Sequence, residues 1–127
     1  MKKLALAFVV VLTVLVSCKK DEKKNPEPSS RTLRYEITGN FTGSLVASYT
    51  TASGGTSNDQ VTLPWNKEIN YAQSVTAAIL AVSGSGGTAG QKVTVVIKRG
   101  GVQVGETIEA IAGSSGGFTK AAAPVVF

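Results

Sequence analysis

The chain has few residues able to do covalent or acid–base chemistry. Its 127 residues include one cysteine, Cys18, and no histidine, which excludes Cys/His zinc sites, histidine-based triads and an internal disulfide. The carboxylates beyond residue 31 never form a calcium-loop pattern. Glu106 and Glu109 are three residues apart, so an extended strand turns them to opposite faces, where they cannot act as an acid–base pair. We therefore expect no enzyme activity, no bound metal and no cofactor.

Cys18 lies at the end of a segment with the pattern of an export signal. Lys2 and Lys3 make a basic start, and residues 4–16 are apolar except for Thr13. This run is shorter than the ~20 apolar residues that a membrane-spanning helix needs. Its end resembles the lipobox of bacterial lipoproteins, in the residues Leu15, Val16, Ser17 and Cys18. The resemblance implies cleavage before Cys18 and acylation of its thiol, with long chains such as palmitate holding the protein on a membrane.

Residues 18–31 are expected to form the lipidated cysteine and a disordered tether. After Cys18 the segment is charged and polar, contains Pro26 and Pro28, and has no aliphatic or aromatic residue, so it cannot bury enough surface to offset its chain entropy. Lys19–Glu22 resembles the lysine-plus-acid export patch of surface lipoproteins of the Bacteroidota; the alternative is a spacer kept soluble by its charges. We expect a lipid-anchored protein of the outer membrane, on its periplasmic face or at the cell surface.

The charge of the remaining residues argues against a nucleic-acid partner. The whole chain carries a net charge of +5, but residues 32–127 hold six Lys and Arg against five Asp and Glu, a balance of +1. A nucleic-acid site needs clustered cations that displace counterions from phosphates. The segment beyond the tether has too few of them.

Residues 32–127 alternate in the manner of β-strands. Leu33–Thr38 places apolar side chains on one face and polar ones on the other. Lys92–Lys98 repeats that pattern. Gly100 and Gly101 follow it, and these glycines allow the positive φ of a two-residue hairpin turn. The returning strand is expected from Val102 to Ala112, with Gly105 as a bulge. A helix is the rival interpretation of residues 75–82. Further strands are expected at 44–50, 61–63, 75–82 and 121–127, with a strand or turn at 68–71.

About seven or eight short strands with frequent turns predict an all-β fold, an immunoglobulin-like antiparallel sandwich of two sheets. The expected organisation is a signal peptide at 1–17, the lipidated cysteine and tether at 18–31, and the sandwich at 32–127. Its core is expected to consist of the large apolar residues Leu33, Tyr35, Ile37, Leu45, Tyr49, Leu63, Trp65, Ile79, Val93, Val95, Ile97, Val104, Ile108 and Phe127.

Several short motifs resemble those of the mycobacterial small membrane protein family, MmpS. They are Tyr35–Gly39, Ala47–Thr50, Leu63–Lys67 and the Val-rich strand that ends at Gly101, and Leu-Pro-Trp-x-Lys is the most specific. Members of the family are small membrane-tethered β-sandwich proteins that accompany large RND-type exporters of lipids or siderophores. The resemblance implies the sandwich fold and an accessory role beside a transporter. This chain departs from the family in having a lipid anchor where they have an N-terminal transmembrane helix.

Candidate ligand sites are few. Trp65, near Tyr71, is a candidate aromatic platform for a sugar or a peptide; the alternative is a plug at the end of the core. The loops Thr51–Asn58 and Gly84–Gly90 are candidates for a small ligand. Gly84–Ala89 has the spacing of a dinucleotide-binding loop, but a strand follows it instead of the helix that receives the pyrophosphate, so we interpret it as a flexible loop.

These features predict a membrane-anchored envelope lipoprotein that acts as a non-catalytic binding or accessory module, with another envelope protein or a transport system as its partner. One alternative is a surface lipoprotein that binds a glycan or a small ligand. The other is a structural protein of the envelope.

Overall fold

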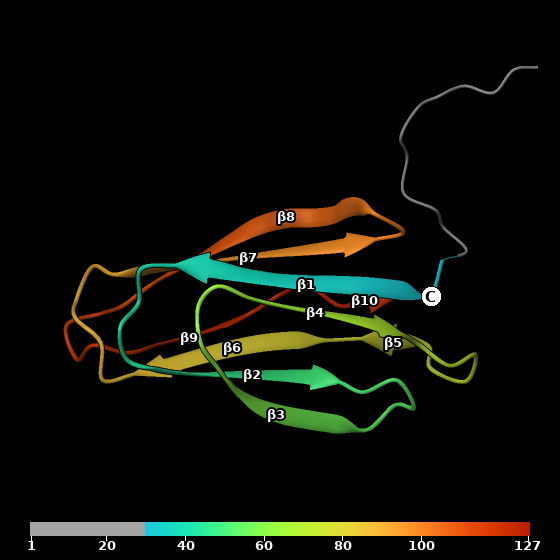
Figure 1. Ribbon diagram of the computed structural model, residues 1–127, viewed down its shortest axis with the longest axis horizontal. Helices are drawn as coiled ribbons and strands as arrows, with labels where there is room; N and C mark the ends of the chain where they lie inside the picture. The colour runs from blue at the N-terminus through green and yellow to red at the C-terminus, as the bar shows by residue number, and fades with distance from the viewer. Residues whose placement is uncertain (1–29) are drawn as a thin grey trace, which may run out of the picture.

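Two antiparallel four-stranded sheets face each other in the computed structural model, which describes residues 30–127 (Figure 1). The first sheet has the order β4-β1-β7-β8, with β1 at Thr32–Gly39, β4 at Trp65–Asn70, β7 at Lys92–Arg99 and β8 at Val102–Ile111. The second has the order β3-β2-β6-β9, with β2 at Ser44–Thr50, β3 at Thr56–Val61, β6 at Leu80–Ser85 and β9 at Phe118–Ala121. Two short strands, β5 at Ala77–Ala78 and β10 at Val125–Val126, pair with each other. The predicted all-β sandwich of two antiparallel sheets is confirmed, and residues 30–127 contain no helix.

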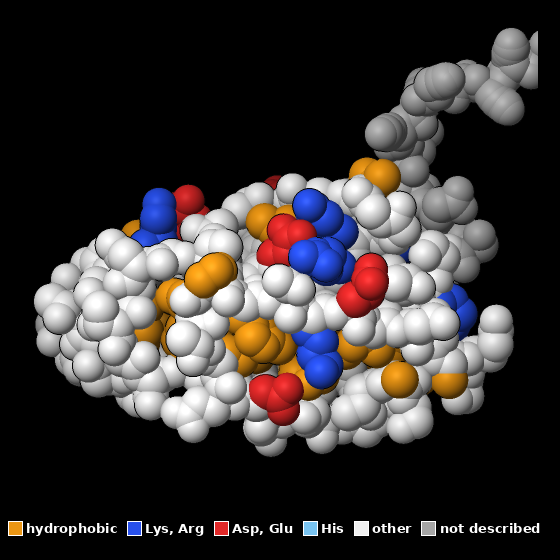
Figure 2. Space-filling model, in the orientation of Figure 1, with side chains coloured by type: hydrophobic (Ala, Val, Ile, Leu, Met, Phe, Trp, Pro, Cys, Tyr) orange, Lys and Arg blue, Asp and Glu red, His pale blue; other side chains and the backbone are white. Residues whose placement is uncertain are grey.

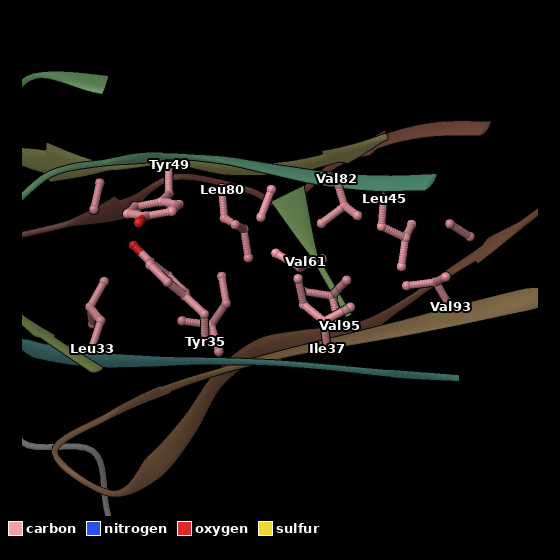
Figure 3. Packing of buried hydrophobic residues seen from close by; sticks show 14 of the residues in the cluster. Leu33, Tyr35, Ile37, Leu45, Tyr49, Val61, Leu80, Val82, Val93 and Val95 are labelled. Carbon is pink, nitrogen blue, oxygen red and sulfur yellow. The ribbon is translucent and has the colours of Figure 1, made fainter. Parts of the chain in front are cut away.

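The core lies between the sheets because the inner positions of the central strands are apolar. On β1, Leu33, Tyr35 and Ile37 are at most 1% exposed. On β2, which lies in the opposite sheet, Leu45 and Tyr49 point back toward them (Figure 3). The alternation of buried and half-exposed residues along β1 and β2 is what period-2 patterning requires of a sheet with one buried face.

Ile79 is the one predicted core residue that lies outside the core, with 50% of its surface exposed. Its neighbours Ala78 and Leu80 are buried, so the alternation turns Ile79 outward. The stretch at 75–82, predicted as one strand, is two strands that break at Ile79, whose N–H donates to Thr50 Oγ1 at 3.0 Å. Side chains that the sequence reading left out complete the core: Phe41, Ala47, Val61, Ile69, Tyr71, Val75, Ala78, Leu80, Val82, Ala110 and Ala112.

The third strand lies earlier than predicted. The sequence indicated a strand at 61–63 after a loop from Thr51 to Asn58, but β3 begins at Thr56 and ends at Val61. Polar residues form this strand because it is the edge of its sheet, where one side of the backbone and one row of side chains meet water. Residues 68–70 belong to β4, which already begins at Trp65, and Tyr71 follows that strand. The segment at 121–127, predicted as one closing strand, is not continuous, because Ala121 ends β9, residues 122–124 belong to no strand and Val125–Val126 form β10.

The hairpin of β7 and β8 matches its sequence prediction. Gly100 and Gly101 both have positive φ, 58° and 87°, at the turn. The ladder shifts register between the pairs Ile97↔Val104 and Val95↔Ile108, so three residues of β8 lie opposite Val96 alone. Gly105, with φ 72°, opens this bulge as the sequence predicted.

Ser30 and Arg31, which precede β1, are hydrogen-bonded to the sandwich. The backbone N–H of Tyr71 donates to the carbonyl of Arg31 at 2.8 Å, and Arg99 Nε donates to the carbonyl of Ser30 at 2.7 Å. The C-terminal Phe127 lies beside this point, where β1 begins (Figure 1). Among the described residues, no helix is long and apolar enough to cross a membrane.

Candidate functional site

Trp65 begins β4 and lies at the border of the core. It follows the cis peptide bond between Leu63 and Pro64, and its half-buried ring packs against the core with its centroid 6.2 Å from that of Tyr49. Lys67, also on β4, lies over the ring of the same tyrosine, with Nζ 5.8 Å from the centre of the Tyr49 ring. The position fits a plug at the edge of the sandwich better than an open platform.

Tyr71 follows β4 at the opposite end of that strand from Trp65, and only 3% of its surface is exposed. Its hydroxyl donates to the carbonyl of Thr50 at 2.6 Å, and its ring lies 5.4 Å from that of Phe127. A ring buried in this way has no face open to a sugar or a peptide. The two aromatic residues singled out by the sequence are therefore not brought together as one binding surface.

The two candidate loops lie at opposite ends of the sandwich. Thr51–Gly55 follows β2 and Gly86–Gln91 follows β6, and these strands are antiparallel neighbours, so their last residues point in opposite directions. The first loop is also shorter than predicted, because residues 56–58 belong to β3. A single ligand therefore cannot be held between the two loops.

Glu36 is paired with two cations on the outer face of the first sheet. Arg34 Nε donates to Glu36 at 2.9 Å, and Lys98 Nζ lies 3.3 Å from the same carboxylate. These contacts, the hydrogen bond from Arg34 first, hold the pKa of Glu36 below its ordinary value. Within residues 30–127, no three His, Cys, Asp or Glu side chains gather closely enough to hold a metal ion.

Asp59 is held by two hydroxyl groups at the edge of the second sheet. Tyr49 donates to Asp59 Oδ2 at 2.5 Å and Ser57 donates to Oδ1 at 2.9 Å. These hydrogen bonds, with that of Tyr49 first, lower the pKa of Asp59 from its ordinary value. Glu36 and Asp59 are both stabilised as anions, which suits structural hydrogen bonding and not proton transfer near neutral pH.

An apolar cleft of about 500 Å³ opens on the side of the sandwich where β8 lies. Most of its lining residues are aliphatic, and two charged residues, Arg99 and Glu106, contribute to it. The volume falls in the range of ~300–1,000 Å³ that is usual for small-molecule sites. We call this hollow the apolar cleft, and it is lined by Val95, Ile97, Arg99, Val104, Gly105, Glu106, Ile108, Ala122, Ala123, Pro124, Val125 and Val126.

One wall of the apolar cleft comes from the bulged strand β8. Val104 and Ile108 pair with Ile97 and Val95 of β7, which are buried, but Val104 and Ile108 remain half-exposed because β8 is the last strand of its sheet. The bulge that begins at Gly105 interrupts the ladder between them. A row of aliphatic side chains is thus left open at the side of the sandwich.

The other wall comes from the break between β9 and β10. Ala122 donates its backbone N–H to the carbonyl of Leu80 at 2.9 Å and its side chain lines the cleft, whereas the neighbouring Ala121 is exposed. Pro124 lacks an N–H and separates the two strands. The edge of the second sheet is therefore irregular where it borders the cleft.

The end of the apolar cleft nearest the start of the described chain is built around Arg99. Its Nε donates to the carbonyl of Ser30 at 2.7 Å, and one terminal nitrogen donates to the carbonyl of Val126 at 3.3 Å. Its guanidinium lies 5.1 Å from the centre of the Phe127 ring, and Arg31 lies 4.5 Å from that centre. The described chain therefore begins directly beside the cleft.

A second surface is distinguished by its lack of charge. The registers of β3, β2, β6 and β9 turn only neutral side chains to the outside of their sheet, and Ser48 donates to Asn58 at 2.5 Å across two of these strands. In Figure 2 the charged side chains gather mainly over the upper sheet, whereas the lower margin is largely white. We call this surface the neutral face, made of Ser44, Val46, Ser48, Thr50, Thr56, Asn58, Gln60, Ala81, Ser83, Ser85, Thr119 and Ala121.

Sequence reasoning did not identify either surface as a site. Gly105 was recognised as a bulge, and this was the available signal for the cleft, because bulges open sheet edges. The neutral face was hidden because β3 was placed too late in the sequence, which removed Thr56, Asn58 and Gln60 from any strand.

Comparison with known proteins gives no assignment. The chain matches no family model, and no curated protein matches it significantly. The resemblance to the MmpS family stays a prediction. The predicted export signal with Lys2 and Lys3, and the predicted lipobox of Leu15–Ser17 and Cys18, lie outside the residues that the structure describes.

Proposed function

We propose that the protein is a lipoprotein of the bacterial envelope, anchored through acyl groups on Cys18, whose sandwich serves as a non-catalytic binding module. The apolar cleft is the observation that carries the binding role. It is an open aliphatic hollow in a domain whose carboxylates Glu36 and Asp59 are committed to surface hydrogen bonds. A module of this kind works by holding a partner near the membrane and does not transform it.

The anchor is supported by the sequence around Cys18. A basic start, an apolar run too short to span a bilayer and the order Leu15-Val16-Ser17-Cys18 form a complete lipoprotein signal. Each buried methylene contributes about 0.8 kcal/mol, so two or more long chains give stable attachment without a spanning helix.

The anchor is tested by mass spectrometry of the protein purified from bacterial membranes. The expected mature chain starts at Cys18 and carries the mass of its acyl groups. Cys18→Ser is expected to remain uncleaved and unlabelled by fatty acid, whereas Ser17→Gly, which keeps a small residue before the cysteine, is processed normally. An unmodified Cys18 with the leader still attached refutes the proposal.

The binding role as an accessory to a transport system is tested by co-purification from envelopes in which the acylated protein is cross-linked in place. A transporter component is expected to co-purify with the parent protein and with Ala121→Trp. It is expected to be lost with Ala122→Trp, whose larger side chain fills the cleft. Equal recovery with both variants counts against a role for the cleft.

The neutral face favours one alternative, the binding of an uncharged glycan. Hydroxyl and amide groups on four adjacent strands present both donors and acceptors without a charge to be desolvated. Binding to neutral polysaccharides is then expected to fall for Ser83→Glu and to persist for Thr94→Glu, which lies on the outer face of the other sheet. Equal binding by both variants excludes this surface.

A further inference from the structure

We infer that the apolar cleft shelters an acyl chain carried by Cys18 of the same molecule, so that the domain can cover part of its own lipid anchor. The inference rests on the acylation proposed above, and it makes the acyl chain a competitor of the partner for the same cleft. It adds a ligand, a fatty-acyl chain, and a source, the protein's own N-terminal residue.

The lining of the cleft selects for hydrocarbon. Val95, Ile97, Val104, Ile108, Ala122 and Val125 contribute aliphatic side chains to the hollow, and Arg99 and Glu106 are the charged residues of its lining. A slender flexible chain can follow such a surface without leaving a polar group unpaired. The cleft offers about 500 Å³, which places it among sites for molecules of this size.

The bulge in β8 argues against an extended peptide as the occupant. A peptide added to a sheet edge gains its affinity from a continuous row of backbone hydrogen bonds. On β8 the bulge interrupts that row between Val104 and Ile108, both of which line the cleft, and bulges are a usual means of preventing edge pairing. An acyl chain has no hydrogen bonds to lose at this interruption.

The course of the chain brings the anchor within reach. Ser30 is fixed beside the cleft by Arg99, which itself lines the cleft. Cys18 precedes Ser30 by twelve residues, a span of at most about 40 Å when extended. Residues 19–29 are charged or polar apart from two prolines, so within that span the lipid on Cys18 is the group whose chemistry matches the cleft.

Tethering favours the chain's own lipid over a free one. A ligand joined by a short flexible linker is present at an effective concentration on the order of millimolar. An acyl chain that leaves the membrane, or that has yet to enter it, therefore meets this cleft before any other. The domain would in this way reduce the hydrocarbon that its anchor exposes to water.

The test uses the acylated full-length protein in bacterial envelopes. Cells are grown with a fatty acid that carries a diazirine group, the envelopes are illuminated, and the peptides cross-linked to the acyl group on Cys18 are identified by mass spectrometry. The expected cross-links join Cys18 to residues 102–108 and 122–126. Mixing protein from isotopically heavy and light cells before illumination separates links within one chain from links between two.

A pair of neighbouring substitutions provides the control. Ala122→Trp fills the cleft and is expected to lower the yield of these cross-links about fivefold or more, whereas Ala121→Trp, on the exposed side of the same segment, leaves it unchanged. Val104→Gln, at a half-exposed position of the other wall, gives a second decrease if the tryptophan prevents folding.

Each other outcome overturns the inference in an identifiable way. A labelled Cys18 whose links reach only phospholipid, or spread evenly over the domain, shows that the anchor stays out of the cleft. Links between heavy and light chains assign the cleft to the anchor of a second copy. A protein that takes up no label refutes the acylation itself, and with it both proposals.

Discussion

The hydroxyl oxygens of Tyr35 and Tyr71 lie 2.7 Å apart inside the sandwich. Tyr71 uses its single proton to donate to the carbonyl of Thr50, so Tyr35 must be the donor to the oxygen of Tyr71. Because Thr50 belongs to β2 of the opposite sheet, this relay of two hydrogen bonds connects the sheets through their core.

Replacing Tyr71 by Phe is expected to destabilise the fold more than replacing Tyr35. Tyr71→Phe removes both bonds and leaves the Tyr35 hydroxyl and the Thr50 carbonyl without partners, at a cost of about 1–3 kcal/mol. Tyr35→Phe removes one donor and keeps the bond to Thr50. Urea denaturation measures the free energies of unfolding, and an equal loss in both variants contradicts the relay.

The same tyrosines predict a loss of stability in alkali. Burial first, and then the hydrogen bond and charge of Tyr71, raise the pKa of Tyr35 above its ordinary value of 10, and burial also raises the pKa of Tyr71. Groups with a raised pKa in the folded state stabilise it fully below the unfolded pKa and lose this contribution as the pH rises. We expect the free energy of unfolding to fall above about pH 10 by up to ~1.4 kcal/mol per pH unit for each tyrosine.

Denaturation between pH 8 and 11.5 checks this expectation. Tyr35→Phe should make the slope of the unfolding free energy against pH shallower by about one proton. Phe127→Leu, which changes an aromatic residue without a hydroxyl, should keep the full slope. A slope that is the same for the parent and Tyr35→Phe contradicts the prediction.

At low pH the residue to examine is Asp59. The hydroxyl of Tyr49, and then that of Ser57, lower its pKa, so the stabilisation is present above the ordinary pKa of an aspartate and is lost as the pH falls through the folded value. Asp59→Asn should therefore make stability less dependent on pH below about 4. Gln60→Ala, at an exposed uncharged position of the same strand as Asp59, is the control and should keep the pH dependence of the parent protein.

The tight packing of Gly84 gives a test of the core at its other end. Gly84 pairs with Phe118 across β6 and β9, and the rings of Phe41 and Phe118 meet edge to face at 5.2 Å. A Cβ atom at Gly84 would lie 2.5 Å from Phe118 and 2.8 Å from Phe41. Gly84→Ala is thus expected to cost about 1–3 kcal/mol.

Gly55→Ala is the matched control for that substitution. A Cβ there would have Thr51 Oγ1 as its nearest neighbour at 3.4 Å, so its effect should stay within about 0.5 kcal/mol of zero. Thermal unfolding of both variants separates steric crowding from the general effect of losing a glycine, and equal shifts in Tm speak against crowding at Gly84.

Elements whose determinants lie within their own residues were predicted from the sequence, and elements that depend on contacts with distant residues were not. Leu33–Thr38 and the glycines at 100 and 101 carry their own pattern and turn chemistry, so β1 and the β7–β8 hairpin were found. The polar strand β3 forms because β2 pairs with it, and its own residues show no alternation of apolar and polar side chains that could have predicted it. Ile79 was misplaced because its exposure depends on a strand break created by contacts with Thr50.

The candidate site was harder to predict for the same reason. Val104 and Ile108 alternate like core residues, and only the position of β8 at the end of its sheet leaves them half-exposed. Their cleft needs Ala122–Val126 as a second wall, which lies far along the chain and approaches through pairing with β5 and β6. Such a juxtaposition follows from the order of the strands in the two sheets, whereas the sequence predicted only the class of fold.

Arg31 is expected to contribute more to stability than its place before the first strand indicates. Its guanidinium donates to the carbonyl of Ala72 at 2.8 Å and to that of Val75, and it lies over the ring of Phe127, so one side chain joins the start of the domain to the β4–β5 turn and the C-terminal segment. Hydrogen bonds that involve a charged group contribute about 1.5–3 kcal/mol, and we expect a loss in that range for Arg31→Ala.

Arg34→Ala tests whether this loss is specific to Arg31. Arg34 pairs with Glu36 on the outside of the first sheet, where 41% of its side chain is exposed, and surface pairs contribute ~0–1 kcal/mol. Hydrogen exchange should speed up at residues 71–75 and 127 in Arg31→Ala and remain unchanged there in Arg34→Ala. If both variants unfold at the same urea concentration, Arg31 is only a surface cation, and the Arg99 contacts alone hold the start of the domain beside the apolar cleft.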